Sequence, residues 1–353
     1  TMANVVGFDG YDVFNNVKLV DEVQNEYREE NGVKGWYYTA KSLKETDMKY
    51  GNMSIATTNQ NHVSKKKWLH GQWTDNAQNF WDDFSSDGKL EEEEEIEAKG
   101  CDLLEHYDFS FLNLKEKISS VSSYETIAPN ETKTFEFIIS WYFPNRPKGW
   151  IEYDADLEKY RQGGYETIKN YYATKFKDAW DIQQYVRKKE AYLESTSRAF
   201  EDALYGTSLP YYVIDAVASN IMSMKSHCCF RIEGGNFLGW EGIRDYVGCG
   251  QGNVNHVWNY ATAVAALFPE LEITMRNVEF NVELDKDGCM PFRARKCLGE
   301  SRWDMIPACD GEFGSILRVY REWKYTGDDE FLRRIWNNMM RALEYSIKEW
   351  DTD

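Results

Sequence analysis

The most informative part of the sequence is 235–272, which reads GNFLGWEG at 235–242, NHVWNY at 255–260 and LFPELE at 267–272. An acidic residue, Glu241, stands between a Trp and a Gly. A glycine-rich loop follows, and a helix with His256 in its first turns comes next. A helix of a packed core needs no such loop. A sugar site does, because aromatic faces hold the sugar ring while carboxylates, amides and imidazoles hold its hydroxyls.

The residues around this stretch predict helices. From Tyr171 onward, apolar residues recur at helical spacing, which indicates five or six amphipathic helices in succession. Asp328 is a predicted N-cap for the last of them, and Gly327 ends the helix before it. Three of the predicted stripes are Val213, Val217, Ile221 and Met224; Leu271, Met275, Val278 and Val282; and Phe313, Ile316, Leu317 and Tyr320.

The segment from Cys229 to Trp240 interrupts the helical pattern. It is predicted to form a short β-hairpin around 233–236, which brings Trp240 and Glu241 to one rim. Trp258 and Tyr260 lie too far apart around the following helix to face one ligand together, so one of them is expected in the core.

Residues 1 to about 145 predict β structure. Segments such as 35–39, 53–58 and 132–141 are rich in β-branched and aromatic residues and are separated by turn sequences. In the last segment Phe135, Phe137 and Ile139 fall on one face, and Thr134, Glu136 and Ile138 on the other. Several short strands with turns favour a β-sandwich.

Composition limits the partners. The chain has 353 residues, with 41 Lys and Arg against 59 Asp and Glu, and a formal net charge of −18. Such a charge disfavours binding to nucleic-acid phosphates and to anionic membrane surfaces, but it does not repel a neutral sugar. Aromatic residues make up 15% of the chain, which suits a sugar cleft and equally a sandwich core. The sequence gives no indication of the oligomeric state.

The seven cysteines form neither a disulfide framework nor a zinc motif. Their number is odd, and Cys228 and Cys229 are adjacent. We expect free thiols in a reducing compartment. No apolar run reaches the ~18 residues of a membrane span, and no signal peptide is visible. The expected location is therefore the cytoplasm. The chain opens within a predicted strand, however, so we expect an incomplete N-terminus, before which a signal could lie.

The order of the Trp-Glu-Gly element at 240–242 and the His-Val-Trp-Asn-Tyr element at 256–260 resembles glycoside hydrolase family 116, the non-lysosomal glucosylceramidase and β-glucosidase group. The resemblance implies an N-terminal β-sandwich followed by an (α/α)6-type helical toroid. On this basis we expect a sandwich domain over 1–150, a connection over 151–184, and the first half of the toroid over 185–353. Such a toroid takes twelve helices, so a truncated member is expected.

The resemblance also implies roles for individual residues. In the family, the catalytic nucleophile lies in a Glu-Gly dipeptide about 15 residues before a His, an arrangement that Glu241 and His256 match. His256, Trp240, Asp304 and Asn255 are then expected to bind a β-glucoside or an oligosaccharide of that kind, without a cofactor or metal. Animal-type relatives carry Asp immediately before this His, where Asn255 stands here, and a His-Asp pair where only Asp304 is retained.

Other readings of the same residues stay open. A loop Glu can bind a backbone amide, and a His near a helix start can be structural. Asp310 is expected to be the N-cap of the helix after it. A glycosidase needs a second carboxylate, and the Asn-Thr-Tyr-Asp type motif that holds the acid in the family is absent here. A non-catalytic sugar-binding remnant and a helical scaffold are the alternatives to a retaining β-glucosidase.

Overall fold

The computed structural model describes residues 1–6, 9–12, 17–20, 22–66, 68, 75–91, 118–148, 166–226, 228–239, 242–243, 248–249, 252–294, 298–299 and 305–351. The chain divides into two compact units, and we describe each by itself. The first consists of Thr1–Asn145 and Ala173–Arg198, and the second of Arg146–Tyr172 and Ala199–Asp353. Helix α3 (Ala179–Tyr205) therefore contributes residues to both units.

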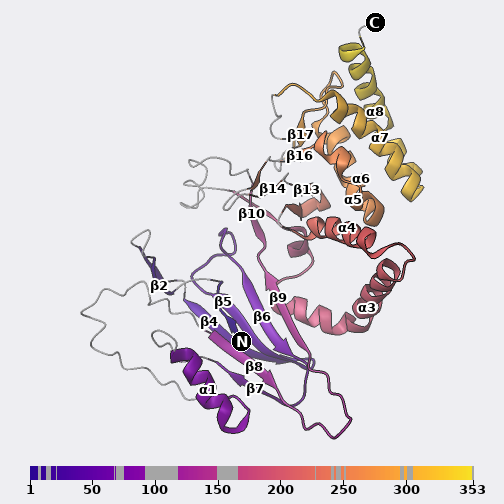
Figure 1. Cartoon of the computed structure of the whole chain (residues 1–353). Coiled ribbons are helices and arrows are strands. Elements are labelled where there is room, and N and C mark those ends of the chain that lie inside the picture. Colours follow the sequence, from indigo (N-terminus) through magenta and orange to yellow (C-terminus); the bar gives the residue numbers. More distant parts are fainter. Residues whose placement is uncertain are drawn as a thin grey trace. The chain divides into compact units, whose positions relative to one another are not determined.

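The first unit is rich in antiparallel β-sheet (Figure 1). A four-stranded sheet has the order β4-β5-β6-β9, and a three-stranded sheet has the order β1-β8-β7. The β structure predicted for this part of the chain is confirmed. The strands are β1 (Met2–Ala3), β2 (Asp9–Asp12), β3 (Val17–Val20), β4 (Val23–Glu30), β5 (Val33–Ala40), β6 (Asn52–Thr57), β7 (His62–Lys65), β8 (Ile118–Ser123) and β9 (Phe137–Tyr142). Strands β2 and β3 form a hairpin of their own.

Side chains of β5 join the two sheets. The Trp36 indole donates to the Ser120 carbonyl of β8 at 2.8 Å, and the Tyr38 hydroxyl is 2.6 Å from the Ser119 hydroxyl. Both rings are buried, and their polar ends are satisfied where they meet β8, as a buried Trp or Tyr requires. The apolar cluster between the sheets consists of Val6, Trp36, Tyr38, Ala40, Ile55 and Val121.

Strand β9 alternates as predicted, but the face with Phe137 and Ile139 is the exposed one, because α3 packs on the opposite face. Ile138, Ser140 and Tyr142 are buried, whereas the residues between them are exposed. The Ser140 hydroxyl donates to the Ala179 carbonyl at the start of α3 at 2.7 Å. From the next turn of α3, Gln183 donates to the Ile138 carbonyl at 3.1 Å. A second helix of this unit is α1 (Asp75–Asp87).

The second unit is mainly helical, and its described residues also form four short strand pairs (Figure 1). Its helices are α4 (Tyr211–Met222), α5 (Ala263–Leu267), α6 (Pro269–Val278), α7 (Cys309–Thr326) and α8 (Asp329–Trp350). The strand pairs are β10 (Asn145–Pro147) with β11 (Thr167–Lys169), β12 (Cys229–Arg231) with β13 (Phe237–Gly239), β14 (Gly242–Ile243) with β15 (Gly248–Cys249), and β16 (Asn253–Val254) with β17 (Arg293–Ala294). The helices predicted from Tyr171 onward are thereby confirmed in type.

The last two helices begin and end as their sequence predicts. The Asp328 side chain accepts a hydrogen bond from the Phe331 amide at 2.8 Å and caps α8. Gly327 ends α7 with a left-handed φ of 66°, a conformation that costs glycine little. Phe331 and Ile335 of α8 are fully buried, so this face of the helix lies in the core.

The predicted stripe of α7 is only partly right: Ile316 packs against the core cluster, but the stripe as a whole does not face inward. Leu317 and Tyr320 are 68% and 60% exposed. The face that α7 buries carries Glu312, Arg318 and Glu322 instead, together with the small Ser315 and Val319. The physical reason is that α6 offers charged partners to this face, as described below, and a paired charge can be buried.

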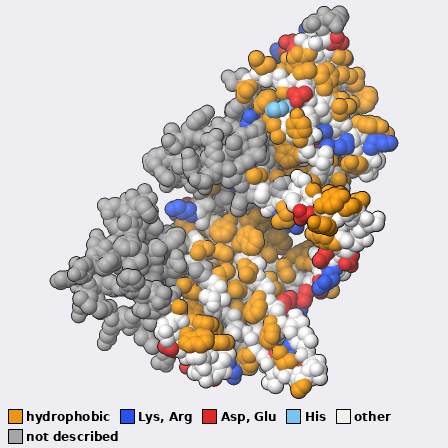
Figure 2. All heavy atoms as spheres, viewed as in Figure 1, with side chains coloured by type: hydrophobic (Ala, Val, Ile, Leu, Met, Phe, Trp, Pro, Cys, Tyr) orange, Lys and Arg blue, Asp and Glu red, His pale blue; other side chains and the backbone are white. Residues whose placement is uncertain are grey.

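Apolar side chains also gather on the surface over α4 (Figure 2). Its residues Tyr211 and Tyr212 are 84% and 64% exposed. Among the helices that can be described, none is both long and apolar enough to cross a membrane.

Candidate functional site

The predicted hairpin before Glu241 is confirmed. Strand β12 pairs with β13 in antiparallel register, with Cys229 opposite Gly239. Gly234 and Gly235 turn the chain with φ values of 82° and 89°. The Arg231 guanidinium holds the turn by donating to the Gly235 carbonyl at 2.7 Å. Strand β13 thus ends at Gly239.

Trp240 and Glu241, the next two residues, lie outside the described residues, as does Asp304. Their predicted roles stay predictions. His256 and Asn255 are described, so the site can be built from the segments that carry these two residues and from the strand that leads to position 240.

Asn253 ties the end of the hairpin to the segment that carries His256. Its side-chain Oδ1 accepts a hydrogen bond from the Gly239 amide at 2.7 Å, and its Nδ2 donates to the Phe237 carbonyl at 3.1 Å. Asn253 is 1% exposed, so water does not compete for these bonds. Strand β16, where Asn253 lies, therefore runs beside the end of β13.

Trp258 packs against the same place. Its ring lies 6.1 Å from that of Phe237 at an interplanar angle of 74°. A Cβ at Gly239 would come within 2.7 Å of Cζ2 of this indole, so only glycine fits there. Tyr260, by contrast, is 79% exposed. Of these two aromatic residues, Trp258 is the one that packs against a core cluster, although it is only partly buried.

His256 presents a partly open imidazole. Its side chain is 34% exposed, and its Nδ1 is 3.9 Å from Oδ2 of Asp310. Its ring lies against that of Phe292, with centroids 4.9 Å apart and tilted by 39°. One face of the imidazole is thus supported by an aromatic ring. An imidazole so placed can donate or accept a hydrogen bond.

Asn255 is held from several sides. Its amide nitrogen donates to the Phe292 carbonyl at 3.1 Å, and its Nδ2 donates to the Pro291 carbonyl at 3.2 Å. The side chain is buried, and its Oδ1 has no hydrogen-bond partner among the described residues. A Cβ at Gly311 would come within 2.2 Å of that oxygen, so α7 packs directly against Asn255.

Asp310 is not the N-cap of α7, and that prediction is wrong. The helix begins at Cys309, with Ala308 at the N-cap position and Asp310 in the first turn. There the carboxylate is near the positive end of the helix dipole. Its main-chain carbonyl accepts from Nδ2 of Asn259 at 2.9 Å, which joins the start of α7 to the turn after His256.

Sequence reasoning missed a buried charge cluster on α6. Glu272 and Arg276 are fully buried, and Glu279 nearly so. The Arg276 guanidinium is 3.1 Å from Glu279 and 3.6 Å from Glu272. Glu279 begins a π-helical turn, Glu279–Glu283, that continues α6. Such turns often occur at functional sites. The signal in the sequence is the acid–base–acid spacing of four and three residues.

The partner face on α7 completes this cluster. Arg318 lies 3.5 Å from Glu279, and Arg321 joins Glu322 at 2.6 Å and Glu272 at 3.4 Å. Burial, followed by the charge of Arg276, lowers the pKa of Arg318 to about 10. Burial also raises the pKa of Glu322. Arg318 keeps its charge at neutral pH, so α6 and α7 meet through paired ions.

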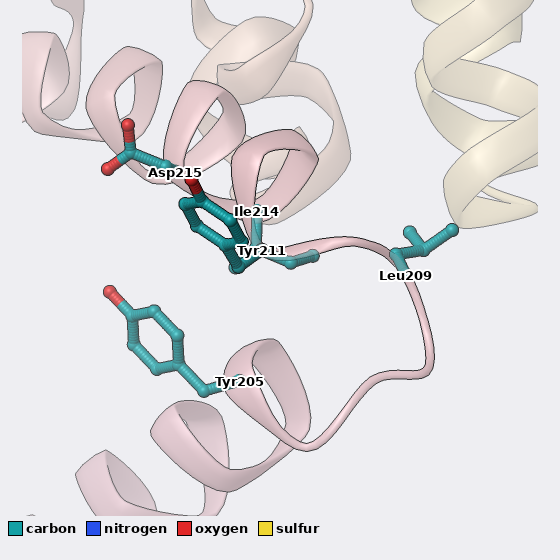
Figure 3. Close-up of a pocket in the computed structure, with 5 residues that line it drawn as sticks. All are labelled: Tyr205, Leu209, Tyr211, Ile214 and Asp215. Atoms are coloured by element: carbon teal, nitrogen blue, oxygen red, sulfur yellow. The ribbon is translucent and has the colours of Figure 1, made fainter.

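A separate pocket of about 260 Å³ opens between the end of α3 and the start of α4. In Figure 3 the Tyr205 ring points across the opening toward Tyr211 and Asp215. None of its residues belongs to the predicted sugar site. Over the described ranges, no three His, Cys, Asp or Glu side chains are grouped to hold a metal ion. The pocket is lined by Tyr205, Leu209, Tyr211, Ile214 and Asp215.

Comparison with known protein families identifies the family of this chain. Residues 1–193 match the family model described as beta-glucosidase 2, glycosyl-hydrolase family 116 N-term. The match covers 193 of the 353 residues, which is more than half of the chain. Among curated proteins, none matches the chain significantly. The match to the family model is sufficient: the chain belongs to glycosyl-hydrolase family 116.

Proposed function

We propose that this chain is part of a retaining β-glucosidase of the glucosylceramidase type, with Glu241 as the nucleophile. Family membership makes it a glycosidase with a carbohydrate substrate, and the β-glucoside and the residue roles are our proposal. His256, Trp240 and Asp304 bind the glucosyl unit. Asn255 has a narrower role, because its side chain is buried and supports the segment that carries His256. No general acid is assigned within these 353 residues.

One observation carries the proposal. Asn253, three residues before His256, hydrogen-bonds to Gly239 and Phe237 of β13, the strand that leads into Trp240 and Glu241. Two peptide units span at most about 7 Å. Position 241 is therefore tethered close to Gly239, and Gly239 is hydrogen-bonded to the segment of His256. A sugar site uses a carboxylate for attack at C1 and an imidazole for a neighbouring hydroxyl, and these are the roles that the proposal gives to Glu241 and His256.

The proposed architecture around this site follows the family. An N-terminal sandwich over about 1–150 precedes a connection at 151–184, and the helices of 185–353 belong to an (α/α)6-type toroid. The two sheets of the first unit and the successive helices of the second are compatible with this arrangement.

The experiment is covalent trapping with dinitrophenyl 2-deoxy-2-fluoro-β-glucoside. A carboxylate oxygen of Glu241 forms a bond to C1, the bond from C1 to the phenolic oxygen breaks, and dinitrophenolate leaves with the electron pair. This leaving group needs no proton, so the reaction does not depend on a general acid. Mass spectrometry should find one fluoroglucosyl ester, on the peptide that contains Glu241.

Two variants control the trapping. Glu241→Gln should abolish the adduct. Glu233→Gln should retain it, because Glu233 lies on the turn of the same hairpin and accepts from the Lys169 amide. An adduct that persists in Glu241→Gln would exclude Glu241 as the nucleophile. Calorimetric binding of glucose or cellobiose without any adduct would favour the sugar-binding alternative, and the absence of both would favour a scaffold.

A further inference from the structure

Arg318 of α7 reaches the candidate sugar site through a main-chain carbonyl. Its Nη2 donates to the Asn255 carbonyl at 3.0 Å and to the Ser315 hydroxyl at 2.7 Å. The same nitrogen is 3.5 Å from Glu279, and the Arg318 side chain is 4% exposed. A buried guanidinium is costly unless it is paired and hydrogen-bonded. All three contacts are made by Nη2, while Nε and Nη1 have no hydrogen-bond partner among the described residues, so Nη2 is the atom that anchors the side chain.

The carbonyl that Arg318 binds belongs to the peptide unit directly before His256. Two other hydrogen bonds, to the carbonyls of Pro291 and Phe292, fix the same Asn255. Main chain and side chain of Asn255 are therefore held from α7 on one side and from the segment before β17 on the other.

His256 follows this fixed residue with a partly open ring. The ring rests on Phe292, whose carbonyl also anchors the Asn255 amide. A side chain that leaves a rigid backbone and lies on a rigid neighbour keeps a narrow range of directions. Such preorganisation matters for any group that must meet a ligand hydroxyl at hydrogen-bond distance.

We propose that Arg318 is a positioning residue for His256: by fixing the Asn255 carbonyl, it orients the imidazole toward a sugar hydroxyl. Ser315 and Glu279 hold the guanidinium for this purpose. The sugar in this statement rests on the proposed function, whereas the control of His256 by Arg318 does not. The competing explanation is that Arg318 only stabilises the packing of α6 against α7.

Two variants and two matched controls separate these explanations. Arg318→Lys keeps the charge and loses the planar fork, and Ser315→Ala removes one hydrogen bond from the guanidinium. Arg321→Lys is the control on the same helix, because Arg321 pairs with Glu322 and Glu272 and not with Asn255. Ser346→Ala is the control for a fully buried serine, located on α8.

The first measurement is the NMR chemical shift of the His256 imidazole in the 353-residue chain at one fixed pH, with its resonance assigned by the loss in His256→Gln. We expect Arg318→Lys and Ser315→Ala to shift this resonance, and both controls to leave it in place. Glucose binding by calorimetry should weaken about tenfold in Arg318→Lys and about threefold in Ser315→Ala, the scale of one hydrogen bond. With an aryl β-glucoside, KM should change more than kcat.

An unshifted His256 resonance in folded Arg318→Lys overturns the proposal, and so does an equal shift in Arg321→Lys. If Arg318→Lys does not fold, Ser315→Ala against Ser346→Ala decides in the same way. The proposed function can fail separately: a His256→Gln variant that binds glucose normally would remove His256 from the sugar site, while the NMR comparison would still decide the role of Arg318.

Discussion

The side chain of Asn253 is hydrogen-bonded to the main chain of Gly239, with the Gly239 amide donating to Oδ1 at 2.7 Å. This contact and the hydrogen bond to the Phe237 carbonyl join two segments of the chain; Gly239 and Asn253 are 14 residues apart. Both partners are buried. The hairpin that precedes Glu241 and the strand that precedes His256 should therefore respond together when this amide is changed.

The first prediction concerns this amide. Asn253→Leu keeps the approximate volume and leaves the buried Gly239 amide without its acceptor. We expect the free energy of unfolding to fall by about 1–3 kcal/mol, and covalent trapping at Glu241 to slow by at least about tenfold. Chemical denaturation and the trapping rate measure the two effects. Asn281→Leu, at an exposed asparagine of the second unit, should change neither. Normal trapping in a stable Asn253→Leu protein would contradict the idea that this bridge sets the site.

The second prediction concerns Gly239 itself. A Cβ there would lie 2.7 Å from the Trp258 ring and 3.2 Å from the Cys228 carbonyl. Gly239→Ala should destabilise the protein by about 1–3 kcal/mol, as overpacking of a core does. Trp258→Phe removes the closest ring atoms, so the double variant should lose less than the sum of the two single losses. Thermal unfolding of the four proteins gives this coupling, and simple additivity would mean that the ring is not the obstacle.

Local signals in the sequence predict a good part of this fold. The hairpin of β12 and β13 follows from its Glu-Gly-Gly-Asn turn, and the boundary between α7 and α8 follows from Gly327 and Asp328. In each case the signal is a residue whose own backbone or side chain makes the structure: glycine in the left-handed region, or an aspartate that accepts from a helix amide. Such features need no knowledge of distant partners.

The buried face of α7 could not be predicted in this way. Apolar periodicity marks Leu317 and Tyr320 as core, yet both are largely exposed, and Arg318 and Glu322 are buried in their place. Charged residues are almost never fully buried unless they are paired, and the partners here come from a different helix. Which face of a helix is inside thus depended on a tertiary pairing between α6 and α7, which a single-segment pattern does not contain.

The third prediction concerns the thiol of Cys229. Burial, and then the neighbouring Cys228, raise its pKa to about 11 from an ordinary value of 9.0. Its thiolate is therefore scarce at pH 9, and iodoacetamide should alkylate Cys229 on the order of tenfold more slowly than the exposed Cys309. Peptide mass spectrometry over time measures both rates. Equal rates at the two cysteines would contradict the burial of this thiol.

The same thiol makes stability depend on pH with a definite sign. Because its folded-state pKa is raised, its contribution to the free energy of unfolding is complete below pH 9.0 and is lost as pH rises through about 11. Cys229→Ser should remove this part of the alkaline loss. Denaturation at intervals across this pH window gives the comparison, with Cys309→Ser as the matched control that should retain the loss.

The last prediction concerns an ion pair buried in the first unit. Lys65 of β7 and Asp83 of α1 are 2.6 Å apart, with side chains 1% and 2% exposed. The lysine also lies 4.5 Å from the Trp68 ring, and the other Asp83 oxygen accepts from the Glu91 amide at 2.9 Å. Lys65→Met leaves a buried carboxylate without its cation, which costs about 3–5 kcal/mol. Adding Asp83→Leu removes that charge and should recover part of the loss. Hydrogen exchange at 62–65 and 75–87, read by mass spectrometry, reports the effect locally.

Lys34→Met is the matched control, because Lys34 pairs at 3.6 Å with a Glu29 that is 56% exposed, and such a pair contributes at most about 1 kcal/mol. Comparable losses in the two lysine variants would show that burial does not set the strength of the Lys65 pair.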